Sequence, residues 1–483
     1  MTSMPPILDL SLQEKQAVAF ESVATEILYG GAAGGGKSHL MRTMAVFFAC
    51  EIPGLQIYIF RRNYADLYKN HMEGPSGFPA MLHEYVQAGL IKIRSDHEIV
   101  FWNGSKIHLC HLQYKKNLAT YQGAEIHMLL MDELTHFSAE EYRYLRGRCR
   151  VVGIKMPPEY AHLFPRILCG TNPGGIGHNW VKADFVDMAA PLSINKMTKS
   201  EGGMLRQFIP ALLEDNPALL EADPEYGERL EGLGNPALVK AMRTGDWNIV
   251  VGGAVDDVWS EKSIVPRFPI PDGWHLFRTF DWGSTHPFSY GLWAVANGEE
   301  IKLPDGRIFR PRPDSLIRVH EWYGTEKLGS NKGLKMASKD VAKGIVAAEQ
   351  SLYESRFIGK IPTSGVADGQ IFNQLEADVP TIASKMADEG IWWSPADKSA
   401  GSRINGLQLV RDRLEAVQKD KEEPGIYFME HCRAATATLP TLPRDDKKPD
   451  DVNTKAEDHV YDDVRYAVLH AQSGYTADYE FGY

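Results

Sequence analysis

The sequence is short of cysteine, of long apolar runs and of positive charge, and each shortage excludes a class of protein. Its five cysteines are scattered over 483 residues and never stand in C-x-x-C spacing, so they predict reduced thiols of a cytosolic protein and no disulfide or zinc framework. No apolar run approaches the roughly 18 residues of a membrane-spanning helix. The first fifteen residues lack the basic flank and apolar stretch of a signal peptide.

The charge balance is acidic. Lys and Arg number 52 and Asp and Glu 63, which gives a formal net charge of −11. This argues against a dedicated nucleic-acid coat protein, although an enzyme that holds DNA through a local basic groove stays possible. The hydrophobic share of 43% is that of a soluble globular protein. The length is sufficient for two or three domains.

The most specific stretch is residues 30–38, GGAAGGGKS, which contains G-x-x-x-x-G-K-S. A short apolar run precedes it and a helix-compatible run without Gly or Pro follows, which is the strand–loop–helix setting of a Walker A motif. Lys37 is expected to reach the β- and γ-phosphates of ATP and Ser38 to hold Mg²⁺. The residues expected to bind nucleotide here are Gly31, Gly34, Gly35, Gly36, Lys37 and Ser38.

Two weaker signals flank this loop. Gln16 stands fifteen residues before Gly31, where some ATP motors read adenine with a Gln amide, and an ordinary surface Gln is the alternative. Residues 56–60 predict a second strand that ends in Arg61 and Arg62. An arginine there can stabilise γ-phosphate charge as a finger, and solvated surface arginines are the alternative.

A third signal is the apolar strand 127–132, which ends in Asp132 and Glu133. About 95 residues after a Walker A loop, this predicts a Walker B segment in which Asp132 holds Mg²⁺ and Glu133 activates water. Four arginines follow, at positions Arg143, Arg146, Arg148 and Arg150. They can form an edge that faces DNA or another subunit, or a solvated helix face.

Strand 166–171 ends in Thr171 and Asn172, a pair that can sense the γ-phosphate, or that forms an ordinary turn before Pro173. Residues 97–112 predict a hairpin turned at Asn103-Gly104. Loop, acidic strand and polar third strand together predict an α/β ATPase domain with a mostly parallel sheet.

The second half predicts strands at 274–281, 288–295, 315–323 and 365–367, and helices at 338–353, 402–419 and 458–472. Asp281 and Asp368 end two of the strands, and Glu321 lies on a third. Acids on strand, strand and helix are the way an RNase H-like nuclease builds a two-metal site. Each acid alone would be an ordinary surface or turn residue.

The last helix offers several metal ligands: Asp458, His459, Asp462 and Asp463. Its apolar stripe runs along 460, 464, 467, 468 and 471. Asp462 lies nearly opposite that stripe and Asp463 borders it, so helical geometry alone does not choose between them. His459 and Asp462 are i, i+3 neighbours and can act on one metal.

Read together, Gln16, GGAAGGGKS, LLMDE and GTNPGG followed by His178 and Trp180 resemble the motor domain of the large terminase subunit of tailed double-stranded DNA bacteriophages. The resemblance runs from about residue 10 to 250. One departure matters, because many relatives carry an Arg in the phosphate loop where this chain has Ala32 and Ala33. The finger must then come from Arg61, Arg62, the 143–150 cluster or a neighbouring subunit.

The resemblance implies an ATPase motor at 1–250 with a lid segment at about 200–250, a linker at 251–265, an RNase H-like endonuclease with a mixed sheet at 266–472 and a tail at 473–483. The family pattern around Asp458-His459 and Arg465-Tyr466 points to Asp462 as the helix ligand, so the implied nuclease metal ligands are Asp281, Asp368, Asp462 and His459, with Mg²⁺ or Mn²⁺ as the ion.

The implied function is ATP-driven translocation of double-stranded DNA into a procapsid, with cutting of concatemeric DNA. The implied partners are the portal protein, the small terminase subunit and further copies of the chain in a ring, expected to be a pentamer, in the host cytoplasm at the portal vertex, with no membrane. Two alternatives stay open. A host repair translocase-nuclease would need helicase motifs and a second motor lobe, and an NTP-switch structural protein would have an inactive second half.

Overall fold

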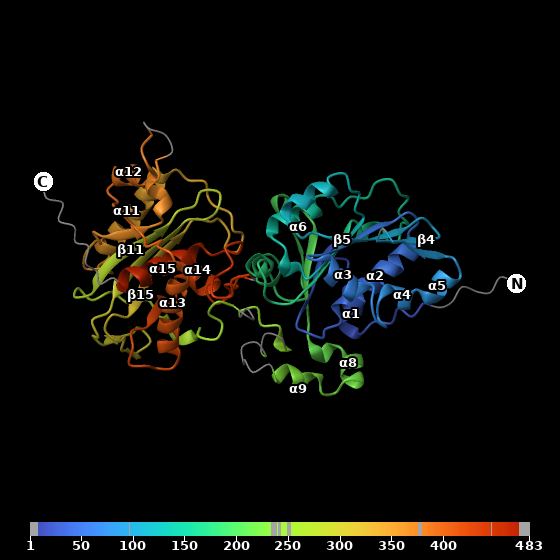
Figure 1. Cartoon of the computed structure of the whole chain (residues 1–483), viewed down its shortest axis with the longest axis horizontal. Helices are drawn as coiled ribbons and strands as arrows, with labels where there is room; N and C mark the ends of the chain where they lie inside the picture. The colour runs from blue at the N-terminus through green and yellow to red at the C-terminus, as the bar shows by residue number, and fades with distance from the viewer. Residues whose placement is uncertain are drawn as a thin grey trace. The chain divides into compact units, whose positions relative to one another are not determined.

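The computed structural model describes residues 8–95, 97–232, 239, 243–248, 253–374, 379–445 and 447–472. The chain divides into two compact units, Met1–Val251 and Gly252–Tyr483 (Figure 1). No helix among the described residues has both the length and the apolar character needed to cross a membrane.

Unit 1 is built on one sheet of nine strands. Its six central strands are parallel, in the order β5-β2-β6-β7-β1-β9, and short antiparallel strands add to both edges. The strands, in spatial order, are β3 (Ile91–Ile93), β4 (Glu98–Phe101), β5 (Lys106–His111), β2 (Gln56–Arg61), β6 (Met128–Asp132), β7 (Arg166–Thr171), β1 (Glu26–Gly31), β9 (Leu205–Ala211) and β8 (Ile194–Lys196).

The central strands β1, β6 and β7 are buried along their whole length, as parallel strands covered on both faces are. The helices of this unit are α1 (Glu14–Glu21), α2 (Lys37–Glu51), α3 (Tyr64–His71), α4 (Phe78–Met81), α5 (His83–Gln87), α6 (Ala139–Arg146), α7 (His178–Val181), α8 (Pro217–Ala222) and α9 (Tyr226–Glu231). Parallel strands place their carboxyl ends at one edge of the sheet, so the loops after β1, β2, β6 and β7 meet there.

The expected strands at 27–29, 56–60, 127–132 and 166–171 and the hairpin at 97–112 are confirmed as β1, β2, β6, β7 and the β4–β5 pair. A mostly parallel α/β sheet is confirmed as well. The short edge strands β3 and β8 were not predicted. Each is three residues long and too short to show a periodicity.

Unit 2 is built on a mixed sheet of seven strands. In spatial order they are β10 (Ile264–Val265), β18 (Ile426–Met429), β15 (Leu316–Tyr323), β12 (Ser289–Val295), β11 (His275–Asp281), β16 (Gly365–Ala367) and β17 (Ser394–Pro395). Strands β11, β12 and β15 lie side by side and antiparallel, and β16 and β17 follow parallel to β11. This mixture of antiparallel and parallel pairs confirms the expected mixed sheet. A separate hairpin pairs β13 (Ile301–Lys302) with β14 (Ile308–Phe309).

Helices cover both faces of this sheet. They are α11 (Ser338–Glu354), α12 (Ile382–Ala387), α13 (Ser402–Gln418), α14 (Arg433–Thr438) and α15 (His459–Gln472). Figure 1 shows α13, α14 and α15 in red beside one another against the strands. Because side chains alternate along a strand, Arg278 of β11 meets Glu349 of α11, whereas Thr279 meets Asp463 of α15.

The segment expected to be a linker, 251–265, includes β10 of this sheet. Its first two residues and the expected tail 473–483 lie outside the described residues.

Candidate functional site

The phosphate loop follows β1 and leads into α2. Gly34 and Gly36 have left-handed backbones, with φ of 79° and 74°. Side chains from outside the loop hold its carbonyl groups: the Tyr29 hydroxyl donates to the Gly35 carbonyl at 2.9 Å, and the Asn216 amide donates to that of Gly34 at 2.6 Å. A Cβ on Gly34 would lie 2.7 Å from Leu213 Cδ1. The loop is therefore fixed by contacts that the motif does not contain.

Lys37 lies between the loop and the end of β7. Its Nζ donates to the Ala32 carbonyl at 2.9 Å and to Asn172 Oδ1 at 2.6 Å. Burial lowers the pKa of Lys37, and the charges of Glu133 and Asp132 act in the opposite direction. The structure thus brings Asn172 to the phosphate-loop lysine, as a γ-phosphate sensor requires.

Asp132 ends β6 within a cluster of nitrogen donors. Its Oδ2 accepts from Asn70 Nδ2 at 2.8 Å and lies 3.2 Å from His71 Nε2. Burial would raise the pKa of Asp132, but the bonds from His71 and Asn70 and the charges of His71 and Arg61 outweigh it and lower that pKa to about 2. Asp132 is therefore ionised. Asn70 also donates to Ser38 Oγ at 2.9 Å, which places the two expected magnesium ligands on either side of one amide.

Glu133 and Arg61 face each other beside this cluster. Glu133 has a left-handed backbone with φ of 56°, which is costly for a residue with a Cβ and typical of functional sites. Arg61 Nη2 lies 3.9 Å from Glu133 Oε1, and its Nε lies 3.5 Å from Asp132 Oδ2. Arg61 therefore reaches the acids of its own chain.

The other finger candidates have partners elsewhere. Arg62 pairs with the buried Glu141 at 2.8 Å. Of the four arginines after Glu133, Arg143 pairs with Asp184 and Arg146 with Glu26. Arg148 lies over the Tyr144 ring, and Arg150 pairs with Glu125. Of these candidates, Arg61 is the arginine that lies against the Walker B acids.

Gln16 lies at the phosphate loop, with 2% of its surface exposed. Its Nε2 donates to the Gly36 carbonyl at 2.9 Å, and its Oε1 accepts from the backbone N–H of Gln13 at 2.8 Å. The Gln16 side chain thus supports the loop, and the reading of adenine by this residue stays a prediction.

A polar chain links the Walker B loop to β7 and to later residues. Thr135 Oγ1 lies 2.9 Å from Thr171 Oγ1 and donates to the Asn172 carbonyl at 3.1 Å. Beyond it, His178 accepts from the Gly174 amide at 2.9 Å and lies 3.0 Å from the Trp247 carbonyl. A Cβ on Gly31 would lie 3.5 Å from Trp247 Nε1. Sequence reasoning missed Thr135 and the packing of Trp247, because neither is part of a phosphate motif.

Unit 2 has a cavity of about 830 Å³ at the carboxyl end of β11. Asp281 ends β11, Asp368 follows β16, and Asp462 lies in the first turn of α15, so three segments far apart in sequence meet. His459, Asp462 and Tyr466 stand at i, i+3 and i+7 on one helix face. The acidic and imidazole groups that line the cavity are Asp281, Asp368, Asp451, Asp458, Asp462, His286 and His459.

The carboxylates of this cavity repel one another. Burial raises the pKa of Asp281 well above its ordinary value, and the charges of Asp462 and Asp368 raise it further. Burial and the Asp462 charge likewise raise the pKa of Asp458 to about 7. Basic groups offset part of this charge, since Lys398 pairs with Asp368, and Arg465 Nη2 lies 3.0 Å from Asp462 Oδ1. Lys398 was not predicted, because it follows a two-residue strand with no motif.

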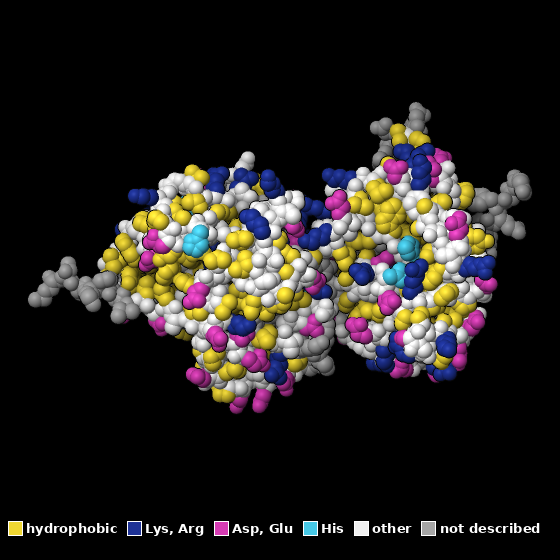
Figure 2. Space-filling view, turned by 180° about the vertical axis from the view of Figure 1, so that it is seen from behind, with side chains coloured by type: hydrophobic (Ala, Val, Ile, Leu, Met, Phe, Trp, Pro, Cys, Tyr) yellow, Lys and Arg dark blue, Asp and Glu magenta, His cyan; other side chains and the backbone are white. Residues whose placement is uncertain are grey.

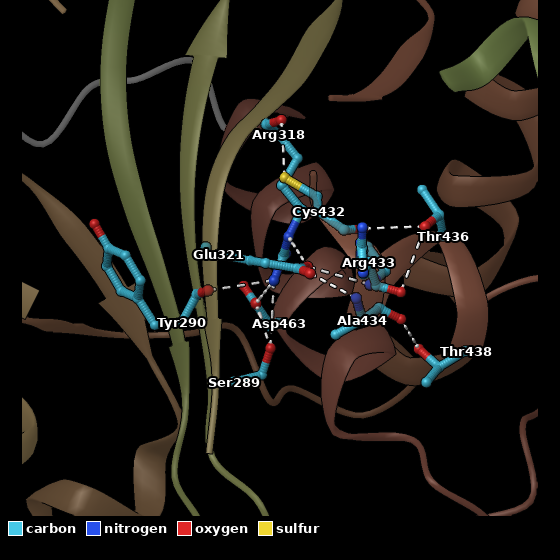
Figure 3. Close-up of polar contacts among 12 residues, drawn as sticks. Ser289, Tyr290, Arg318, Glu321, Cys432, Arg433, Ala434, Thr436, Thr438 and Asp463 are labelled. Carbon is cyan, nitrogen blue, oxygen red and sulfur yellow. Dashed lines mark hydrogen bonds and ion pairs between the residues drawn. The ribbon is translucent and has the colours of Figure 1, made fainter. Parts of the chain in front are cut away.

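Asp463 and Glu321 lie outside this cavity, in a buried network behind it (Figure 3). Asp463 Oδ2 accepts from Ser289 Oγ at 2.7 Å and from Arg318 Nη2 at 2.7 Å. Glu321 Oε2 accepts from the Ala435 amide at 3.1 Å, and Glu321 also pairs with Arg318 at 3.3 Å. Both acids are therefore engaged in structural contacts. Asp462 and its neighbour Asp458, by contrast, line the cavity.

The cavity supplies the oxygen ligands that Mg²⁺ and Mn²⁺ prefer. As placed here, no three His, Cys, Asp or Glu side chains in the described ranges form a group that could hold one metal ion. Asp281, Asp368 and Asp462 nevertheless line one cavity, and the charges of the other two raise the pKa of Asp281 beyond the effect of its burial. A divalent cation would offset that repulsion, so the residues fit such an ion in donor chemistry and in charge.

Comparison with known proteins connects the N-terminal part of unit 1 to a family. Residues 28–155 match the family model described as "Terminase large subunit, T4likevirus-type, N-terminal". This segment contains the phosphate loop, Arg61, Asn70, Asp132 and Glu133. No curated protein sequence matches the chain significantly.

Several solved phage proteins resemble the chain at low identity. The large terminase of a thermophilic bacteriophage, solved in complex with ADP, is 16% identical, over 95% of this chain and 98% of that one, with a TM-score of 0.38. The HK97 bacteriophage large terminase is 10% identical, over 95% of both chains, with a TM-score of 0.41. The P22 large terminase nuclease domain is 14% identical, over 46% of this chain and 95% of that domain, with a TM-score of 0.32.

Proposed function

We propose that this chain, whose residues 28–155 match a family model of the terminase large subunit, is a DNA-packaging enzyme of tailed phages with two activities. Unit 1 hydrolyses ATP to move double-stranded DNA into a procapsid. Unit 2 is a divalent-metal-dependent endonuclease that cuts concatemeric DNA.

The observation that carries the ATPase is the convergence at the carboxyl edge of the parallel sheet. The phosphate loop, Lys37, Asn172, Asp132 and Glu133 come from three strand ends and meet there. Lys37 exchanges its bonds to Ala32 and Asn172 for phosphate oxygens, which leaves Asn172 free to report the γ-phosphate. Ser38 and Asp132 would hold Mg²⁺, which would neutralise phosphate charge. Glu133 orients and deprotonates the attacking water, and Arg61 stabilises charge on the transferred group.

The placement of Arg61 favours a finger that acts within its own chain. Its guanidinium already faces Asp132 and Glu133, and its Nη1 donates to the Asp66 carbonyl at 2.9 Å. A ring of subunits would then order this arginine without having to supply it. We propose that this ring has five subunits.

The hydrogen bonds among Thr135, Thr171 and Asn172 would couple ATP hydrolysis to a movement of the loop after β7. Loss of the γ-phosphate releases Asn172, and the same loop reaches Trp247 through His178. Trp247 lies at the end of the expected lid segment, so a change at the γ-phosphate would reach both the loop after β7 and the lid. We propose that this movement advances DNA.

In unit 2, Asp281, Asp368 and Asp462 would hold the nuclease metal ions, with Asp458 and His459 beside them. His459 Nδ1 lies 3.2 Å from Asp281 Oδ2 and the Tyr466 hydroxyl donates to Asp281 Oδ1 at 3.3 Å, which orients that carboxylate. Two metal ions would activate water and stabilise the leaving oxygen. Lys398 and Arg403 line the same cavity and are suited to DNA phosphates.

DNA binding by a chain of charge −11 must rely on local basic groups. On the face drawn in Figure 2, Lys and Arg side chains are interspersed with Asp and Glu. We therefore propose weak, salt-sensitive DNA binding without base preference in unit 1. The remaining proposed partners are the portal protein, the small terminase subunit and further copies of the chain, in the host cytoplasm at the portal vertex.

The test is a packaging assay with empty capsids, ATP, Mg²⁺ and linear DNA, scored by nuclease-protected DNA, beside a plasmid-cutting assay with Mn²⁺. Wild-type protein should protect DNA and cut plasmid, and Lys37→Ala should lose protection while it still cuts. A protein that hydrolyses ATP and cuts DNA but never protects it would favour the host translocase-nuclease. Hydrolysis without any cutting would favour the NTP-switch protein.

A further inference from the structure

Asn70, in the last turn of α3, lies between the two residues expected to hold Mg²⁺ in unit 1. Its Nδ2 donates to Ser38 Oγ at 2.9 Å and to Asp132 Oδ2 at 2.8 Å. We propose that Asn70 is a positioning residue that sets the magnesium ligands of the ATPase. The inference rests on the proposed ATPase function and adds a residue that none of its motifs contains.

An amide nitrogen has two hydrogens, and Asn70 has one acceptor for each. Ser38 comes from the start of α2 and Asp132 from the end of β6, and no hydrogen bond between these two side chains is present in the described part of the chain. Asn70 therefore fixes the spacing of a loop residue and a strand residue that belong to different elements. The Ser38 hydroxyl oxygen, which accepts from Asn70, keeps a second lone pair for a metal ion or its water.

Asn70, with two neighbouring side chains, also determines which carboxylate oxygen of Asp132 is left for a metal ion. Three nitrogen atoms gather on Oδ2: Asn70 Nδ2 at 2.8 Å, His71 Nε2 at 3.2 Å and Arg61 Nε at 3.5 Å. Across the described ranges, the polar contacts of Asp132 all involve Oδ2. The carboxylate is thus held by one oxygen and presents Oδ1, as second-layer hydrogen bonds do around many metal sites.

Helix α3 is itself fixed at both ends, which makes Asn70 a rigid support. Arg42 of α2, which is 4% exposed, donates from Nη1 to the Asn70 carbonyl at 2.9 Å. Arg61 Nη1 donates to the Asp66 carbonyl in the first turn of α3 at 2.9 Å. Leu67 is fully buried between these two points. The Asn70 amide therefore has little freedom to leave its two acceptors.

The experiment compares wild-type protein with Asn70→Ala and with the control Asn63→Ala. Asn63 precedes the same helix, is exposed and contacts Asp66 at 3.1 Å, away from the metal ligands. Binding of a fluorescent ATP analogue is measured in EDTA and in Mg²⁺, and ATP hydrolysis is titrated with Mg²⁺ at saturating ATP. Removal of a residue that supports metal ligands typically costs 10–100-fold in metal affinity.

We expect Asn70→Ala to raise the Mg²⁺ concentration for half-maximal hydrolysis by about 10-fold or more and to lose the extra nucleotide affinity that Mg²⁺ gives, with binding in EDTA unchanged. Asn63→Ala should match wild type in both. Asn70→Ser, which keeps one donor, should fall between the two and decides the matter if Asn70→Ala does not fold. The proposal is wrong if the Mg²⁺ dependence is unchanged, or if affinity falls equally with and without Mg²⁺. A wild-type protein that neither binds nor hydrolyses ATP would instead refute the proposed function.

Discussion

The two sites differ in how their charges are balanced. In unit 1, Asp132 is surrounded by nitrogen donors of the chain itself, and its pKa is lowered to about 2. In unit 2, Asp281 is buried beside Asp462 and Asp368, and its pKa is raised well above its ordinary value. The same residue type at the end of a buried strand is therefore stabilised as an anion in one unit and destabilised as an anion in the other.

The difference indicates two ways of using a carboxylate. The proposed ATPase site of unit 1 is nearly complete as a set of protein contacts, and ATP with Mg²⁺ would bring both negative charge and a cation. The cavity of unit 2 holds an excess of negative charge that the chain only partly offsets through Lys398, Arg403 and Arg465. In the proposed nuclease, divalent cations would offset the rest.

The largest effect is expected from the neighbouring acids Asp462 and Asp463. Asp462→Ala should abolish plasmid cutting with Mn²⁺, because Asp462 lines the cavity. It removes an acceptor of Arg465 but also relieves the repulsion on Asp281 and Asp458, so its unfolding temperature should change less than that of Asp463→Ala. Asp463→Ala removes one of the two carboxylates paired with the buried Arg318 and should lower the free energy of unfolding by roughly 3–5 kcal/mol. Cutting assays and thermal denaturation of both variants make the comparison. Normal cutting by Asp462→Ala would show that Asp462 is not the metal ligand, and loss of cutting in Asp458→Ala or Asp463→Ala would then identify the acid that is.

The next effect concerns the base of the ATPase. Glu133→Gln keeps the shape of the side chain but cannot accept a proton, so hydrolysis should fall by about 10²–10⁴-fold. Nucleotide binding should persist, because Glu133 is not expected to hold the phosphates. Single-turnover hydrolysis and equilibrium binding of an ATP analogue measure the two quantities. Unchanged turnover would transfer the role of base to Asp132 or another acid.

A smaller effect separates backbone strain from contact in the phosphate loop. Gly34 and Gly104 have similar left-handed backbones, with φ of 79° and 85°, so an Ala at either should cost about 1–2 kcal/mol. A Cβ on Gly34 would also lie 2.7 Å from Leu213 Cδ1, whereas one on Gly104 would meet nothing within 4 Å. Only Gly34→Ala should weaken nucleotide binding, measured by titration beside thermal denaturation. Equal binding by both variants would show that the loop can shift around Leu213.

The smallest effect is a pH dependence of unit 1. Burial lowers the pKa of His178 to about 3, below the ordinary value of 6.5. Protonation of the unfolded chain then opposes folding, so the contribution of His178 is complete above pH 6.5 and falls by up to roughly 1.4 kcal/mol per pH unit below it, towards pH 3. Unfolding free energies between pH 7.5 and 5 should therefore decline less steeply for His178→Gln. Parallel curves would show that folding leaves the pKa of His178 unchanged.

Much of unit 1 was predictable because its chemistry lies in short, contiguous patterns. Gly36, Lys37 and Ser38 follow one another, and buried parallel strands appear as apolar runs that end in polar residues. The supports of the same site were not predictable. Asn70 and Tyr29 stand far from the loop or inside ordinary elements, and only the packing of α3 and β1 brings them to it.

The sequence by itself determined the phosphate loop, the parallel and mixed sheets and the set of acids available to unit 2, because local patterns of burial and turn residues carry that information. Tertiary structure alone decided which acids meet. Asp462 and Asp463 are adjacent on one helix, yet Asp462 lines a cavity, whereas Asp463 pairs with Arg318 of strand β15. Successive residues of a helix point about 100° apart, so the strands that α15 packs against, and not the sequence of α15, assign each acid its partners.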